Sequence, residues 1–179
     1  MEQLLFLKNS VKNFYRVGAV MPSSRFLSKR MARATHGAET IIELGAGTGA
    51  ITKELLKILP LQGRLTILEI NPDFVSFLEK NFQDKRMVYY AKSAEFLPKI
   101  FGKNSAAAIV SSLPFGNFSR QRTEKILSGV VDCLKPNGVF VQFQYSLKSW
   151  RTLKKIFRQV DICFEPRNLW PAFIYICRK

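Results

Sequence analysis

A chain of 179 residues, 47% of them hydrophobic, is long enough to bury one substantial core and too apolar to be intrinsically disordered. No apolar run approaches the ~20 residues that a membrane-spanning helix requires, and the N-terminus lacks the apolar segment and cleavage site of a signal peptide, so we expect a cytoplasmic protein. The formal charge of +15 is more than solubility requires, and it predicts a polyanionic partner, either nucleic acid or an anionic membrane surface, with a generally basic proteome as the alternative explanation.

The first 37 residues predict a basic helical cap ahead of the main domain. Apolar residues recur at intervals of three and four within residues 2–16, which is the pattern of an amphipathic helix, and basic residues form a separate row. Such a helix can lie in a membrane interface or pack on the domain with a solvated polar face, and the short stripe does not distinguish the two. The basic row consists of Lys8, Lys12 and Arg16.

A second helix is expected after a break at residues 18–24. Ser23 or Ser24 can cap this helix, because a serine hydroxyl accepts a hydrogen bond from an amide of the first turn. The helix is also basic, so the first 35 residues hold seven basic side chains against a single acid, Glu2. The basic residues of this second helix are Arg25, Lys29, Arg30 and Arg33.

Residues 38–179 alternate strand and helix patterns, which predicts an α/β core. Strand-length apolar runs are separated by stretches with helical spacing, and no linker or internal repeat interrupts them. This alternation implies a Rossmann-like, seven-stranded, mostly parallel sheet with helices on both faces, within a single domain of residues 1–179. The predicted strands are 40–42, 64–69, 87–91, 106–112, 139–145, 161–164 and 172–177, and the predicted helices are 50–59, 71–82, 95–101, 120–134 and 147–160.

A glycine-rich turn, Glu43-Leu44-Gly45-Ala46-Gly47-Thr48-Gly49, joins the first strand of this core to its first helix. Glycines permit a sharp reversal, positive φ and close approach of a ligand to the backbone, although loops also use glycine for purely structural reasons. Glu69 ends the second strand, 20 residues after Gly49, where a carboxylate can accept both hydroxyls of a ribose. The two features together predict a nucleoside site, and the acid-x-G-x-G-x-G spacing differs from the G-x-G-x-x-G of dinucleotide sites.

This turn resembles motif I of the class I S-adenosylmethionine-dependent methyltransferases. In that family the turn accommodates the methionine part of the cofactor and the acid after the second strand holds the ribose. Ser93 and Ala94 occupy the place where many members have an Asp that receives the adenine amino group. The resemblance implies S-adenosylmethionine as cofactor, bound by Glu43, Gly45, Ala46, Gly47, Thr48, Gly49, Glu69, Ile70, Ser93, Ala94, Ser112, Ser23 and Ser24.

Ser112-Leu113-Pro114-Phe115 resembles the Asn-(Leu/Pro)-Pro-aromatic motif of amino-methylating enzymes, including the rRNA adenine dimethyltransferases. In that motif a side-chain oxygen and a backbone carbonyl accept hydrogen bonds from the target nitrogen, which makes Ser112 and Leu113 the catalytic candidates. Methyl transfer is an in-line displacement to which positioning contributes most. Serine in place of Asn argues against a flat exocyclic base amine as substrate, and a plain strand-ending turn is the alternative interpretation.

Four segments together make the chain resemble the bacterial phospholipid N-methyltransferases, which convert phosphatidylethanolamine stepwise toward phosphatidylcholine. This resemblance implies a peripheral enzyme at the inner face of the membrane, docked by its basic N-terminal helix, with residues 21–27 over the cofactor. The four segments are residues 18–27, 112–118, 141–145 and 167–173. The basic residues expected to contact anionic lipid are Lys8, Lys12, Arg16, Arg25, Lys29 and Arg30.

Two other functions stay open from the sequence. One is an RNA or DNA adenine methyltransferase, which the charge permits; Ser112 weakens it, as does the expected lack of the C-terminal helical domain of rRNA dimethyltransferases. The other is a cofactor-binding protein without catalysis. For the group that deprotonates the substrate ammonium, the candidates are Tyr15, Tyr145 and the carbonyl of Leu113.

Metal and imidazole chemistry are not expected. Cys133, Cys163 and Cys177 are widely spaced on apolar stretches, which is typical of reduced core residues and not of a zinc site. His36 is the only histidine and lies near a predicted loop.

Overall fold

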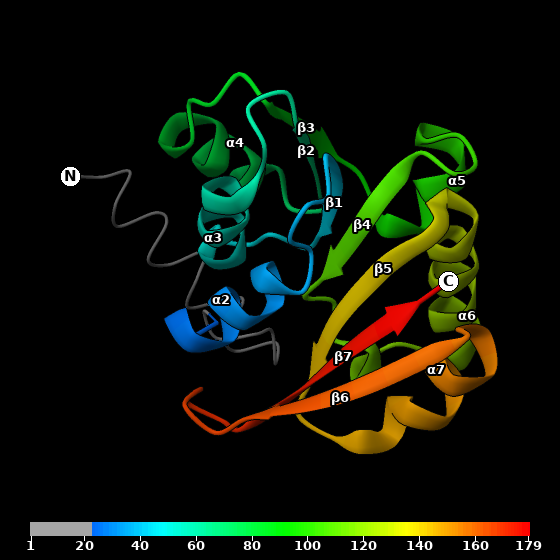
Figure 1. Cartoon of the computed structure of the whole chain (residues 1–179). Helices are drawn as coiled ribbons and strands as arrows, with labels where there is room; N and C mark the ends of the chain where they lie inside the picture. Colours follow the sequence, from blue (N-terminus) through cyan, green and yellow to red (C-terminus); the bar gives the residue numbers. More distant parts are fainter. Residues whose placement is uncertain (1–22) are drawn as a thin grey trace.

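The computed structural model describes residues 23–179, so the predicted helix at residues 2–16 lies outside the described part. Its seven strands are β1 Thr40–Leu44, β2 Arg64–Glu69, β3 Met87–Ala91, β4 Ala106–Ser111, β5 Leu134–Gln144, β6 Gln159–Glu165 and β7 Ala172–Arg178. They form one sheet in the order β3-β2-β1-β4-β5-β7-β6 (Figure 1). The first five strands pair in parallel, and β7 runs antiparallel between β5 and β6. The predicted Rossmann-like, mostly parallel sheet is confirmed.

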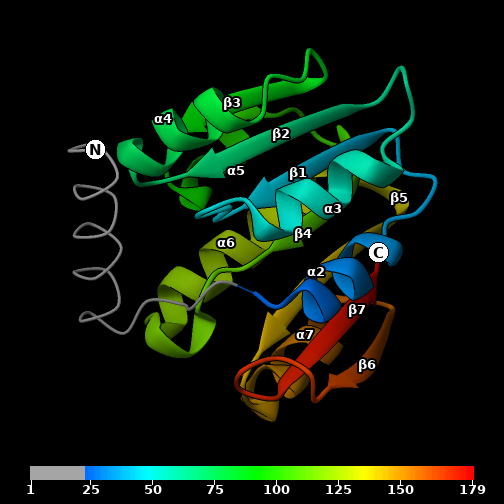
Figure 2. The same ribbon diagram turned by 90° about the vertical axis from the view of Figure 1, so that its left-hand side faces the viewer.

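Helices cover both faces of this sheet (Figure 2). One hydrophobic cluster joins α2, α3 and α4 to the sheet, and a second joins α5, α6 and α7 to the other face. Strand β1 supplies both clusters, Ile41 to the first and Ile42 to the second, because successive side chains of a strand point to opposite faces. The helices are α2 Arg25–Arg33, α3 Ala50–Ile58, α4 Pro72–Asn81, α5 Leu97–Ile100, α6 Arg120–Cys133 and α7 Trp150–Ile156, with the 3₁₀ turns η1 Ala94–Phe96, η2 Phe115–Asn117 and η3 Leu147–Ser149.

Two helix starts carry the caps expected from their sequences. The Ser24 hydroxyl accepts a hydrogen bond from the amide of Leu27 at 3.2 Å, which caps α2. The Asn71 side chain accepts one from the amide of Asp73 at 2.9 Å, which caps α4. Each cap satisfies an amide that has no partner within its helix. No helix within residues 23–179 is long and apolar enough to cross a membrane.

The predicted helix at residues 147–160 is too long. Helix α7 ends at Ile156, Val160 lies in β6, and Leu147, in the 3₁₀ turn before α7, is 50% exposed. Strand β6 pairs with β7 along its whole length, from Gln159 opposite Arg178 to Glu165 opposite Ala172. These hydrogen bonds, formed with the next strand in the chain, outweigh the helical spacing of the preceding residues.

Residues 135–138, which lie between the predicted helix at 120–134 and the predicted strand at 139–145, belong to β5. The parallel pairing shifts register here, from Ala106 opposite Leu134 to Ala108 opposite Val139, so the extra residues form a bulge. Asn137 has a φ of 62°, which asparagine tolerates better than most residues.

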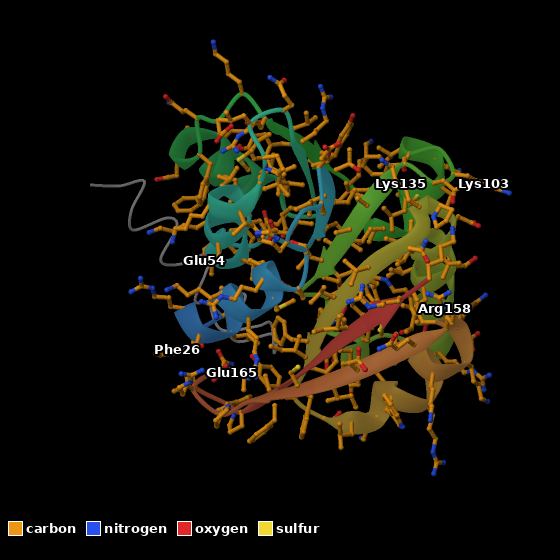
Figure 3. The ribbon with its side chains drawn as sticks, viewed as in Figure 1. Phe26, Glu54, Lys103, Lys135, Arg158 and Glu165 are labelled. Carbon is orange, nitrogen blue, oxygen red and sulfur yellow. The ribbon has the colours of Figure 1, made fainter. Side chains whose placement is uncertain are left out.

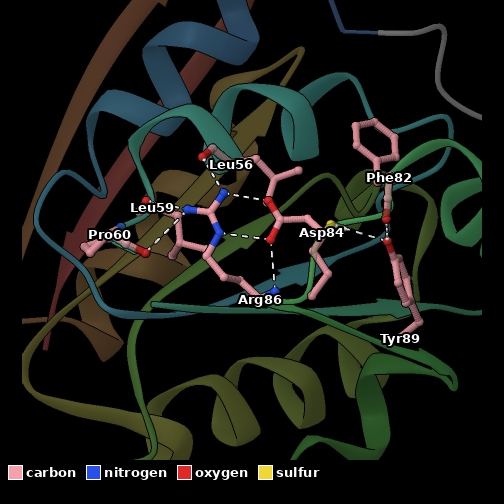
Figure 4. Close-up of polar contacts among 8 residues, drawn as sticks. Leu56, Leu59, Pro60, Phe82, Asp84, Arg86 and Tyr89 are labelled. Atoms are coloured by element: carbon pink, nitrogen blue, oxygen red, sulfur yellow. Dashed lines mark hydrogen bonds and ion pairs between the residues drawn. The ribbon is translucent and has the colours of Figure 1, made fainter. Parts of the chain in front are cut away.

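Arg86 fastens the loop before β3 to the C-terminal end of α3 (Figure 4). Its guanidinium donates to both carboxylate oxygens of Asp84, at 2.9 and 2.6 Å, and to the carbonyl oxygen of Leu59 at 2.7 Å. A cation at a helix C-terminus satisfies carbonyls that have no partner within the helix. The hydrogen bonds from Arg86 lower the pKa of Asp84 to about 2, so the pair stays ionised down to acid pH.

We expect Arg86→Ala to lower the free energy of unfolding by about 2 kcal/mol, because Asp84 and Leu59 lose a charged donor. Asp84 is more acidic in the folded protein than its ordinary value of 3.8, so its stabilising effect is present above that pH and is lost as pH falls toward about 2. The difference in the free energy of unfolding between wild type and variant should therefore shrink as the pH falls over this range. Urea unfolding at several pH values measures it, with the exposed Lys85→Ala as the control; an equal loss in both variants would contradict the assignment.

Candidate active site

Several of the residues predicted to bind the cofactor lie where the parallel strands end. The amide of Gly45, just after β1, donates to the carbonyl of Leu68 in β2 at 2.8 Å. The amide of Ser112, just after β4, donates to the carbonyl of Leu44 in β1 at 3.0 Å. The glycine turn, Glu69 at the end of β2 and the Ser-Leu-Pro turn therefore lie at one edge of the sheet, where open α/β sheets bind ligands.

The three glycines of the turn have different tasks. Gly45, Gly47 and Gly49 all have positive φ, of 74°, 53° and 82°. A Cβ on Gly49 would lie 2.6 Å from the ring of Phe82, so this glycine lets the turn pack against the end of α4. A Cβ on Gly45 would lie 3.0 Å from the Leu113 side chain, whereas one on Gly47 would meet nothing within 4 Å. Gly49 is therefore required for packing within the protein. Gly47 has open space beside its backbone, which would allow a ligand to approach.

Glu69 fixes the glycine turn in place. Its buried carboxylate accepts hydrogen bonds from the amide of Gly47 and from the amide of Asn71, both at 3.0 Å. Each carboxylate oxygen has room for a second donor, so the hydroxyls of a ribose can still be accepted. Its neighbour Ile70 is 59% exposed at the same place. The ribose role of Glu69 stays a prediction, now with a geometry that holds the carboxylate against the turn.

Glu43 presents a buried oxygen without a partner. Its side chain is wholly buried, with Oε2 accepting from the Thr52 hydroxyl at 2.8 Å, and Oε1 has no hydrogen-bond partner within residues 23–179. Burial raises the pKa of Glu43 to about 8; the charge of Glu69 adds to the shift and the hydrogen bond from Thr52 opposes it. The acid is therefore mostly protonated at neutral pH. An unpartnered buried oxygen beside an open glycine turn suits S-adenosylmethionine, which carries an ammonium and a sulfonium group.

Ser93 and Ser24 are engaged in local structure. The Ser93 hydroxyl accepts from the amide of Glu95 at 3.3 Å and caps η1, and Ala94 beside it is buried. Ser24 caps α2, and its amide donates to the side-chain oxygen of Asn168 at 2.8 Å, in the turn between β6 and β7. The cofactor roles of these serines, and of Ser23, Ala46 and Thr48, stay predictions.

The carbonyl of Leu113, predicted to accept a hydrogen bond from the substrate nitrogen, already accepts three. The donors are the amide of Phe115 at 2.9 Å and the side-chain amides of Gln142 and Gln144 at 3.0 and 2.9 Å. A carbonyl has two lone pairs, so a substrate amine would have to displace one of these donors. The neighbouring Ser112 is half-buried, and no hydrogen bond of its hydroxyl is recorded within the described part of the chain. The catalytic roles of Ser112 and Leu113 stay predictions.

Gln142 and Gln144 received no role from the sequence. Both lie in β5, on the face opposite Val141 and Phe143, and both are buried. The signal was present as two polar residues alternating with apolar ones in a strand expected to be central. Buried amides in such a strand require partners, and here they find the backbone of the Ser-Leu-Pro turn.

The sheet order, with β7 inserted antiparallel beside β5, and the glycine turn facing an acid at the end of β2 define a class I S-adenosylmethionine-dependent methyltransferase. A family model described as a methyltransferase domain matches residues 41–138, and the chain belongs to this family. Within residues 23–179, no group of His, Cys, Asp or Glu is arranged to hold a metal ion.

Two curated relatives and one solved structure describe the likeness further. The ornithine lipid N-methyltransferase of Singulisphaera acidiphila is 32% identical, over 97% of this chain and 94% of that protein. The ubiquinone/menaquinone biosynthesis C-methyltransferase UbiE of Wigglesworthia glossinidia brevipalpis is 30% identical over 69% of this chain, which spans half of that relative. The 1,6-didemethyltoxoflavin-N1-methyltransferase of Burkholderia thailandensis, solved with S-adenosylhomocysteine, has a TM-score of 0.71, at 13% identity over 98% of this chain and 88% of that one. This structure shares the fold.

We expect Glu69→Gln to weaken S-adenosylmethionine binding roughly 10-fold and Glu69→Ala roughly 100-fold, since a hydrogen bond to a charged group contributes about 1.5–3 kcal/mol. Glutamine keeps one acceptor for the Gly47 or Asn71 amide, whereas alanine releases the glycine turn as well. Isothermal titration calorimetry measures both affinities. The exposed Glu79→Ala is the matched control, and full affinity in Glu69→Ala would remove the ribose assignment.

We also expect cofactor binding to release a proton from Glu43 at neutral pH. Its pKa of about 8 in the free protein should fall when a cationic group of the ligand approaches Oε1, so the affinity should rise from about pH 6 to pH 8. In the free protein, the contribution of Glu43 to stability is present below its ordinary pKa of 4.5 and is lost as pH rises through about 8.

Calorimetry in buffers of different ionisation enthalpy counts the released proton. Glu43→Gln imitates the protonated acid and should abolish the release and flatten the pH dependence. The same proton count in wild type and variant would show that another group titrates.

Proposed function

We propose that this methyltransferase transfers methyl groups from S-adenosylmethionine to the headgroup amine of phosphatidylethanolamine and its methylated derivatives, at the inner face of the membrane. The observation that carries the proposal is a match along 97% of the chain to a protein named as a lipid N-methyltransferase. Ethanolamine and the ornithine side chain both end in a primary amine, so the same displacement serves either headgroup. Ornithine lipid is the second candidate acceptor for the same reason.

The site supplies positioning more than acid–base chemistry. S-adenosylmethionine, when bound, provides the electrophilic methyl group. The Gln142 and Gln144 amides hold the turn that carries Ser112 and Leu113, and Gly45 lies against Leu113. The turn expected to bind the methyl acceptor is therefore fixed relative to the glycine turn expected to bind the methyl donor. Fixed mutual placement is the main requirement of an in-line displacement.

Tyr145 is a poor choice for the base that deprotonates the ammonium. Burial raises its pKa above the ordinary value, with a hydrogen bond involving Asn168 acting in the opposite direction. Its phenol therefore keeps its proton at neutral pH. Tyr15 lies outside the described residues, and the carbonyl of Leu113 is occupied by its three donors.

The positive charge supports an anionic membrane as partner. Arg25, Lys29 and Arg30 are carried by α2, which leads from the predicted N-terminal helix to the core. A basic residue near an anionic bilayer contributes about 1 kcal/mol of attraction. Lys8, Lys12 and Arg16, also expected at the membrane, precede the described part of the chain.

The test is methyl transfer from radiolabelled S-adenosylmethionine to vesicles that contain phosphatidylethanolamine, to vesicles that contain ornithine lipid, and to total RNA. We expect label in phosphatidylethanolamine, separated by thin-layer chromatography, with Glu69→Ala inactive and Glu79→Ala active. Label in ornithine lipid alone would favour the second candidate. Label confined to RNA, or none in any lipid, would overturn the proposal.

A further inference from the structure

A cavity of about 440 Å³ lies between α2 and the turn that joins β6 to β7, residues 166–171. Five of its lining side chains are basic and only Glu165 is acidic. Figure 3 shows two of its lining residues, Phe26 on α2 and Glu165 at the end of β6, close together on the side of the molecule away from Lys103 and Lys135. The basic lining residues are Arg25, Lys29, Arg30, Arg33 and Arg167.

Glu165 holds one wall of this cavity rigid. Its buried carboxylate accepts two hydrogen bonds from Arg167, at 2.8 and 3.1 Å, and forms an ion pair with Arg30 at 3.4 Å. The Arg167 guanidinium also stacks over the Phe26 ring at 4.3 Å from its centre. Arg30 donates in addition to the carbonyl of Phe164 at 2.8 Å. These contacts join α2 to the β6–β7 turn and fix two guanidinium groups without using all of their donors.

The remaining charge of the cavity is uncompensated. No ion pair of Arg25, Lys29 or Arg33 is recorded within residues 23–179. A concave site with clustered arginine and lysine donors suits an anion that has several oxygen atoms, and phosphate is the group that arginine and lysine bind together most effectively.

Large apolar side chains lie exposed beside the cavity. Leu169 and Trp170, on the β6–β7 turn, are 66% and 64% exposed, and Phe164 at the end of β6 is 51% exposed. The Trp170 ring packs edge-on against Tyr145, 5.8 Å between centres. Tryptophan is favoured at the membrane–water interface, and an exposed leucine gains free energy in a bilayer but offers no ring for stacking on a nucleic-acid base. The apolar turn and the basic cavity together favour a lipid over RNA.

We propose that this cavity binds the phosphate of a membrane lipid, while Leu169 and Trp170 enter the bilayer interface beside it. The choice of lipid as occupant rests on the proposed function, whereas the site itself is independent of the predicted N-terminal docking helix. The turn is joined to the start of α2, where the Ser24 amide donates to Asn168, and to the end of β5, where Trp170 packs on Tyr145, the residue after Gln144. A lipid held there keeps its headgroup at the edge of the sheet where the glycine turn lies.

The insertion is tested by tryptophan fluorescence, because the chain has only two tryptophans. Trp150→Phe leaves Trp170 as the reporter, and Trp170→Phe leaves Trp150 as the matched control. With vesicles of phosphatidylcholine and phosphatidylglycerol, and without methyl donor, we expect a blue shift and quenching by brominated lipids only when Trp170 is present. The same response from Trp150, or no response from Trp170, would overturn the insertion.

The phosphate site is tested by sedimentation with the same vesicles. Lys29→Gln combined with Arg33→Gln should weaken binding roughly 30-fold, at about 1 kcal/mol for each charge. Lys103→Gln combined with Lys135→Gln removes the same charge from exposed positions on the other side of the molecule and should change binding less than threefold. Equal weakening in both pairs would mean that only total charge matters, and the cavity would then not be a site.

Two further arms separate the source of the anion. Millimolar inorganic phosphate or glycerophosphate should compete only weakly, since neither adds the apolar contact; full displacement would identify a site for free phosphate instead. If RNA protects the Trp170 fluorescence from a water-soluble quencher more strongly than vesicles do, the lipid assignment is wrong. Vesicle binding without any methylated lipid would contradict the proposed function but not this site. Lipid methylation that the cavity variants do not affect would contradict this site but not the proposed function.

Discussion

The rest of the site depends on the two hydrogen bonds that the Glu69 carboxylate accepts from backbone amides. One amide belongs to Gly47 in the turn after β1, and the other to Asn71 at the start of α4. A buried carboxylate is costly unless backbone donors satisfy it, and these donors exist only when the turn and α4 take up their observed positions. The same acid therefore stabilises the fold locally and presents oxygen atoms at the ligand edge.

A second acid, Glu43, lies close to Glu69. Glu43 is held mostly neutral by burial, with the charge of Glu69 adding to the effect. A neutral carboxyl can ionise when a cation arrives, whereas the amides of Gly47 and Asn71 hold Glu69 in place as a hydrogen-bond acceptor. Glu43 can therefore begin the glycine turn while buried, because it is mostly uncharged at neutral pH.

Local sequence patterns predicted much of the fold and of the cofactor edge, because their causes are local. The caps at Ser24 and Asn71 depend on amides two or three residues away, and β2 and β3 are short runs of mostly apolar residues. The bulge before Val139 depends instead on pairing with β4, which precedes helix α6 in the chain, and the short α7 depends on the hairpin that β6 forms with β7. The glutamine contacts to Leu113 escaped prediction for the same reason, since their partner is 29 and 31 residues away.

Helix α2 shows how packing gives a basic segment a fixed position on the domain. Leu27 and Met31 are completely buried in the cluster shared with α3, so the helix is rigidly attached to the domain. Its other side carries Arg25 and Lys29 into the cavity with the β6–β7 turn. Part of the positive charge seen in the composition is therefore carried by side chains of this helix. Their hydrogen-bond donors lie at a fixed position relative to the glycine turn. Rigid attachment also has an energetic consequence, because donors already held in place lose little conformational entropy when an anion binds.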